Sequence, residues 1–200
     1  MAGQSQPSDS IARPHQGAAA GTGLLRAASD RVVWLEKRIA GAFVAAIFCL
    51  LISNVVTRML SIPIIWIDEL AVHFMIVGAF FGASIAIRER EHIAVTLLRD
   101  ALRGPGRTIL IVGVDLMVIL FIAALAVILW RWFDPLGILA AESRAAYAAA
   151  TFNFLYDEPT TTIGIRKVWF WLVLPVFCST ALLHACANLT GTVRAVRGDA

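Results

Sequence analysis

Four polar side chains stand inside long apolar runs of this 200-residue sequence, where they could do chemistry within a membrane. They are Asn54, His73, Asp115 and His184. Polar and ionisable groups are costly to bury in a bilayer, so they mark either proton and ion pathways or hydrogen bonds between helices. Structural hydrogen bonds between helices are the commoner role, and we expect that role here.

The depth of each residue along its apolar run predicts which of them can meet. At a rise of about 1.5 Å per residue, His73 and Asn54 lie about 12 Å and 9 Å from the same membrane face, so we expect a hydrogen bond between them. Asp115 lies about 11 Å from the opposite face. No Lys or Arg within the spans is placed to neutralise it. We expect Asp115 to be protonated, to bond a hydroxyl such as that of Ser84, or to face a partner protein.

The sequence contains none of the patterns that we associate with catalysis or cofactor binding. His184 lies about 24 Å from one membrane face, whereas His73 lies about 12 Å from the same face. Because their depths differ, the two histidines are poorly placed to hold one haem. The cysteines are odd in number and lack metal-ligand spacing, and neither GxSxG, HExxH nor a Walker loop is present. We therefore predict a protein that is not an enzyme, with no catalytic site, metal or cofactor.

The composition places these residues in a membrane protein. Apolar residues make up 59% of the chain and charged residues only 16%, against about 45–50% and about 25% in soluble domains. A membrane-spanning helix needs roughly 20 apolar residues. The segments that satisfy this length are Ile39–Leu60, Ile65–Ile87, Thr108–Trp130 and Val168–Leu189. The predicted fold is thus an all-α membrane protein with four transmembrane helices, forming a membrane domain over residues 31–190.

The flanking charges and aromatic residues predict the orientation. Most of the 17 Lys and Arg residues lie before the first span, between the second and third, and after the fourth. Cytoplasmic loops are enriched in Lys and Arg, so both termini are expected to be cytoplasmic. Tryptophans gather at the other membrane face, as in an aromatic belt. The net charge of +3 follows from the same bias, and the basic residues form no stripe that would indicate nucleic-acid binding.

The segments outside the spans have distinct compositions. Residues 1–30 are rich in small and polar residues and are expected to be a disordered cytoplasmic tail. Residues 191–200 are expected to be a second cytoplasmic tail. Apolar residues at helical spacing between spans two and three predict a short interfacial helix that ends at Gly104-Pro105-Gly106. Residues 133–167 form a long periplasmic connection whose role the sequence leaves open.

The second span carries the clearest pattern. Gly78, Gly82 and Ala86 recur every four residues and leave one helix face without bulk, which permits close approach of another helix. Arg88 and His92 follow four residues apart, on one face of a continued helix. They form either a charged helix end that reaches into the headgroups or a docking surface for another subunit.

Together these residues resemble the small membrane subunit, of DctQ type, of tripartite ATP-independent periplasmic (TRAP) transporters. The resemblance covers Trp34 to Leu189. It is carried by Trp66-Ile67-Asp68-Glu69-Leu70-Ala71, by Gly82-Ala83, and by Ala86-Ile87-Arg88 with His92-Ile93-Ala94-Val95; a second match is Ile165 to Pro175. Thr96 and Glu91 stand where the family often has Asp and Gly, so no role of that Asp is carried over.

The resemblance implies a non-catalytic subunit in a bacterial inner membrane. It would brace a large multi-span permease subunit (DctM type) that moves an organic acid, delivered by a periplasmic binding protein (DctP type), using a cation gradient. The candidate interface residues are Trp66, Glu69, Gly78, Gly82, Arg88 and His92, and membrane lipid is the other expected contact. The alternatives are the small subunit of a tripartite tricarboxylate transporter and a free-standing four-helix protein or carrier that uses Asp115.

Overall fold

The computed structural model describes residues 16–90 and 105–198, and the side chains within 23–90 and 106–198. Four helices in this part of the chain are long and apolar enough to cross a membrane, as predicted. The long helices are α1 (Gln16–Met59), α2 (Trp66–Glu89), α4 (Pro105–Phe133) and α8 (Val173–Arg197). The described residues also form three short helices: α5 (Pro135–Ala140), α6 (Arg144–Thr151) and α7 (Val168–Trp171).

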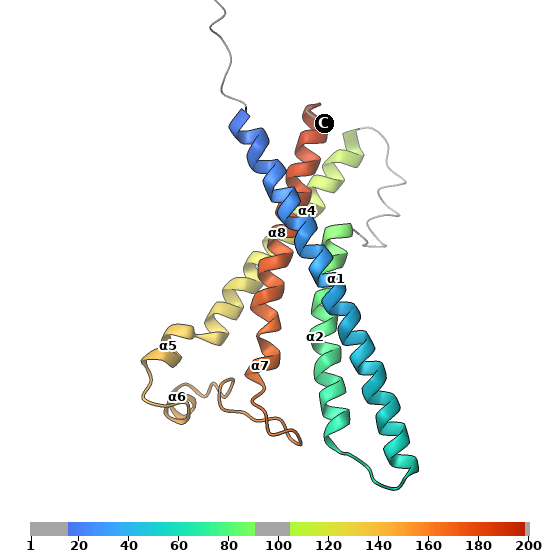
Figure 1. Cartoon of the computed structure of the whole chain (residues 1–200). Helices are drawn as coiled ribbons and strands as arrows, with labels where there is room; N and C mark the ends of the chain where they lie inside the picture. The colour runs from blue at the N-terminus through green and yellow to red at the C-terminus, as the bar shows by residue number, and fades with distance from the viewer. Residues whose placement is uncertain (1–15, 91–104, 199–200) are drawn as a thin grey trace, which may run out of the picture.

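The long helices form two pairs, and α8 connects them. Helix α1 packs along α2, α4 packs along α8, and α8 also contacts both α1 and α2. The pairs cross near the middle of the molecule and diverge toward the end that carries α5 and α6 (Figure 1). We call this the loop end, and we call the opposite end, which holds the start of α1 and the end of α8, the terminal end (Figure 1).

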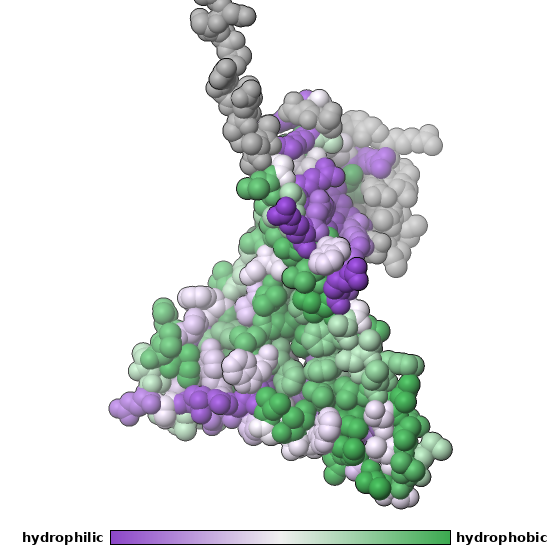
Figure 2. Space-filling model, in the orientation of Figure 1, coloured by the Kyte–Doolittle hydropathy of each residue, from purple (hydrophilic) through white to green (hydrophobic). Residues whose placement is uncertain are grey.

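Small side chains let α8 pack closely at the centre of the bundle. Ala181 and Ala185 are fully or almost fully buried, and Ile122 of α4 and Phe177 of α8 lie in the same apolar cluster. Small residues are typical of membrane helix interfaces, because lipid gives no hydrophobic drive for association and packing must supply the attraction. Helices α1 and α4 instead leave most of their apolar surface exposed, and apolar surface continues over the lower part of the molecule (Figure 2).

The first helix begins earlier than we predicted. Helix α1 starts at Gln16, whereas residues 1–30 were expected to be a disordered tail and the first span to begin near Ile39. Helix-favouring Ala and Leu residues support this extension, and Ser29 is completely buried in it. Likewise α8 continues to Arg197, so a helix occupies most of the predicted C-terminal tail 191–200. The predicted interfacial helix lies outside the described residues.

The long connection at the loop end is folded around Asp134. This residue has a φ of +37°, and its carboxylate accepts hydrogen bonds from Gly137 N at 3.0 Å and from the Tyr147 hydroxyl at 3.0 Å. A Cβ on Gly137 would lie 1.9 Å from Asp134 Oδ2, so any other residue there would displace the Asp134 carboxylate. Tyr156 Oη donates to Phe133 O at 2.5 Å and ties the segment to the end of α4.

Candidate functional site

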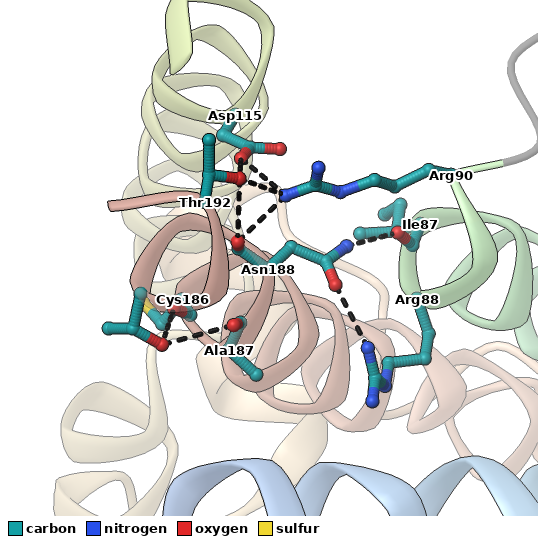
Figure 3. Close-up of polar contacts among 9 residues, drawn as sticks. Ile87, Arg88, Arg90, Asp115, Cys186, Ala187, Asn188 and Thr192 are labelled. Carbon is teal, nitrogen blue, oxygen red and sulfur yellow. Dashed lines mark hydrogen bonds and ion pairs between the residues drawn. The ribbon is translucent and has the colours of Figure 1, made fainter. Parts of the chain in front are cut away.

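The main polar cluster joins α2, α4 and α8 near the terminal end (Figure 3). Its centre is Asn188, a buried residue of α8. Asn188 Nδ2 donates to Ile87 O at 2.7 Å, while its Oδ1 accepts from Arg88 Nη1 at 3.0 Å. One amide side chain thus satisfies a carbonyl of the last turn of α2 and an arginine that follows it. This arrangement fixes the end of α2 against α8.

Arg90 neutralises Asp115, which corrects our expectation that no basic residue would do so. Arg90 ends α2 with a left-handed φ of +56°, and its side chain reaches across to α4 and α8 (Figure 3). Its Nη2 lies 2.6 Å from Asp115 Oδ2 and also donates to Asn188 O and to Thr192 Oγ1, each at 2.7 Å. Only 8% of the Asp115 side chain is exposed. Ser84 bonds Thr180 instead, at 2.9 Å.

Two further ion pairs attach the start of α1 to the end of α2. Arg88 pairs with Asp30, in addition to its bond with Asn188, and Lys37 pairs with Glu89. The predicted interface residue Arg88 is therefore occupied within this chain. His92, the residue predicted to act beside it, lies outside the described residues.

A second buried group connects α1 with α8. His184 is fully buried; its Nδ1 lies 2.7 Å from Ser29 Oγ, and its Nε2 lies 3.0 Å from Glu36 Oε2. These partners of His184 were not predicted from the sequence, because Ser29 and Glu36 precede the predicted first span. Their spacing of seven residues places both on one helix face, and that signal indicates a shared contact.

At the loop end, Glu69 holds the long connection. Its carboxylate accepts hydrogen bonds from the backbone N–H groups of Thr161 and Thr162, each at 2.6 Å, from Ile163 N at 3.3 Å, and from Thr162 Oγ1 at 2.5 Å. A second acid in the same turn, Asp68, pairs with Arg58 at 2.7 Å. Glu69, predicted at a subunit interface, thus has partners within the chain.

The expected hydrogen bond between His73 and Asn54 is not formed. His73 Nδ1 lies 2.7 Å from Glu69 O in its own helix, and its ring lies 4.2 Å from that of Phe170. Asn54 instead donates to Asp68. Depth alone placed the pair at similar levels, but the rotation of each helix about its axis directs the two side chains to different partners.

The small-residue stripe of α2 has two different environments. A Cβ on Gly78 would lie 3.4 Å from Phe43 Cβ, so this glycine faces α1 within the chain. A Cβ on Gly82 would meet no atom within 4 Å, and 44% of Trp66 is exposed. Of the described interface candidates, Gly82 and Trp66 have surface free for another protein.

Comparison with known proteins gives a consistent result. The sequence model of the family "Tripartite ATP-independent periplasmic transporters, DctQ component" matches residues 47–195. The chain is 26% identical over 143 residues to the sialic acid TRAP transporter small permease protein SiaQ of Vibrio cholerae, a match that covers 71% of this chain and 72% of that protein. It is 30% identical over 143 residues to the sialic acid TRAP transporter permease protein SiaT of Haemophilus influenzae, again over 71% of this chain but only 20% of that protein.

Proposed function

Because this chain belongs to the DctQ component family of TRAP transporters, whose members are multi-pass proteins of the bacterial inner membrane, we propose that it braces the large permease subunit of such a transporter. The family is a transporter membrane subunit and not an enzyme class. In this role the chain holds the moving subunit in the bilayer, and the substrate pathway lies in that subunit.

The observation that carries this proposal is that the polar groups at membrane depth bond to other helices of the same chain. Asp115 is paired with Arg90, and His184 lies between Ser29 and Glu36. A carrier needs ionisable or polar groups that open to a pathway and exchange partners. In the described part of the chain, these groups instead join helices to one another, which is how a rigid support is built.

The match with the longer permease protein supports a direct partnership. A segment similar to this chain makes up 20% of the Haemophilus influenzae permease, so there it is part of a much larger membrane chain. We infer that the present chain associates with a separate large permease subunit. The exposed apolar faces of α1 and α4, with Gly82 and Trp66 of α2, provide the surface for that contact.

The charge distribution along the chain supports a proposed orientation in the membrane. With the basic terminal end in the cytoplasm, the loop end with α5 and α6 faces the periplasm, where a substrate-binding protein would dock. The transported compound is proposed to be an organic acid taken up with a cation gradient. The names of the two relatives, both sialic acid transporters, agree with a substrate that bears a carboxylate.

The proposal is tested by purification and uptake of the same preparation. A C-terminally tagged chain is expressed with its neighbouring genes, and a large multi-span permease should copurify with it at a fixed ratio. The chain reconstituted alone should transport nothing, and the complex should transport an organic acid. The contrary outcome is transport by the isolated chain that Asp115→Asn abolishes, which would identify a free-standing carrier.

A further inference from the structure

A cavity of about 610 Å³ opens at the terminal end between the two helix pairs. The charged side chains that line it are Arg26 of α1 and Arg88 and Arg90 at the end of α2. Asn188 and Thr192 of α8 add polar groups to the wall. Such a combination of guanidinium, amide and hydroxyl groups suits the oxygen atoms of a phosphate.

The three arginines of this cavity differ in their partners among the described residues. The Nε atoms of Arg88 and Arg90 are buried and have no hydrogen-bond partner among the described residues. Arg26 has no hydrogen bond or ion pair with any of them either. The carboxylates of Asp30 and Asp115, which pair with Arg88 and Arg90, do not line the cavity. The cavity is therefore lined by three arginines and no carboxylate, and this net positive charge favours an anion.

An apolar groove adjoins the basic cavity. It has a volume of about 420 Å³, lies between α4 and α8, and shares Thr108 and Val196 with the cavity. Its wall on α4 runs from Thr108 through Gly113 to Leu116, a rise of roughly 12 Å along the helix. Gly113 has no side chain, and a Cβ there would meet no atom within 4 Å. The groove thus leads from the charged end of the bundle into the membrane-spanning part.

We propose that the cavity and the groove together bind one anionic phospholipid. Its phosphate lies among Arg26, Arg88 and Arg90, and one acyl chain lies in the groove along α4. Basic pockets between membrane helices at the cytoplasmic side are a known form of lipid headgroup recognition. The continuity with an apolar groove favours a lipid over free phosphate, since free phosphate has no use for the groove. The bound lipid would fill the space between the two helix pairs and fix their relative position.

The test is a lipid titration of the detergent-purified full-length chain followed by native mass spectrometry. The probes are dioleoylphosphatidylglycerol, which is anionic, and dioleoylphosphatidylcholine, which has the same chains and no net charge. We expect the anionic lipid to bind about fivefold more tightly, because a single charge near basic side chains has about that effect. Excess inorganic phosphate should not displace it. Equal binding of both lipids would overturn the proposal.

Matched variants separate the headgroup site from the groove. Arg26→Gln should weaken binding of phosphatidylglycerol about fivefold, whereas Arg31→Gln, which changes an exposed arginine of the same helix outside the cavity, should not. Gly113→Phe should block the groove and reduce binding about tenfold, whereas Gly41→Phe on α1, also at an open position, should have no effect. Gel filtration checks that each variant is folded. Displacement by phosphate with no effect of Gly113→Phe would show a free-anion site and would refute the lipid proposal.

Discussion

Arg90 Nη2 lies 2.6 Å from Asp115 Oδ2, so the residue that ends α2 neutralises the acid buried in α4. The same guanidinium bonds Asn188 O and Thr192 Oγ1 of α8. One side chain therefore links three of the four long helices. Because α4 packs on α8 and α8 packs on α2, this link fixes the angle between the two helix pairs at the terminal end.

Removal of Arg90 should destabilise the bundle through the charge that it leaves behind. Arg90→Ala leaves Asp115 buried without its cation, and we expect a loss of about 3 kcal/mol in the free energy of unfolding. The double variant Arg90→Ala with Asp115→Asn should regain most of that loss, since no buried charge remains. Unfolding in mixed micelles by a denaturing detergent measures both. Equal stability of the single and double variants would contradict the pairing.

The His184 group should behave as a buried structural bond between α1 and α8. His184→Ala leaves Glu36, which is only 2% exposed, without its main partner. We expect a loss of about 3 kcal/mol in unfolding free energy, measured in the same way. Ser179→Ala, at an exposed position of the same helix, is the matched control and should change stability by less than about 0.5 kcal/mol.

Glu69 should keep the loop of residues 161–163 ordered. Glu69→Ala removes the acceptor of the Thr161, Thr162 and Ile163 amides. Hydrogen exchange of these amides should become about tenfold faster, while exchange in the centre of α8 stays unchanged. Asp68→Ala is the control, because the hydrogen bonds of Asp68 are to Arg58 and Asn54 and not to the described residues of this loop. Unchanged exchange in Glu69→Ala would contradict the role of Glu69.

The two glycines of α2 should differ in what they disturb. Gly78→Leu forces a side chain against Phe43 and should lower the stability of the isolated chain by about 2 kcal/mol. A Cβ on Gly82 would lie more than 4 Å from the described neighbours, so Gly82→Leu should leave the stability of the isolated chain unchanged. If Gly82 faces the large permease subunit, the Gly82→Leu complex should purify in lower yield and show reduced uptake. Normal yield and uptake would remove Gly82 from the proposed interface.

The two tyrosines of the chain should titrate at unusually high pH. Burial raises the pKa of Tyr147, and its hydrogen bond to the Asp134 carboxylate raises it further; burial also raises the pKa of Tyr156. A raised pKa means that folding favours the neutral phenol. The stabilisation is therefore present below about pH 10 and is lost as the pH rises through the folded-state pKa. Tyrosinate absorbance follows Tyr147 alone in Tyr156→Phe, and a midpoint near 10 would contradict the prediction.

Hydrophobic length and flanking residues allowed much of this protein to be predicted. Four apolar runs are long enough to cross a bilayer. Each is predicted to be a helix, because the backbone N–H and C=O groups of a single segment in lipid must hydrogen-bond to one another. The order and spacing of Trp66, Glu69, Gly82 and Arg88 were enough to indicate the family. The start of α1 was missed because residues 16–30 lack the hydropathy of a span, although they form a helix.

The partners of the polar residues depended on the tertiary structure. Arg90, at the left-handed turn that ends α2, contacts Asp115 of α4, and the hydropathy of the sequence does not predict that contact. Glu69 meets Thr162, 93 residues later, because the long connection returns to the start of α2. Spacing along a chain predicts which residues share one helix face, but not which face of another helix they meet. The partners of a residue on another helix depend on the crossing angles and rotations of the packed helices, and these depend on all the contacts of the bundle.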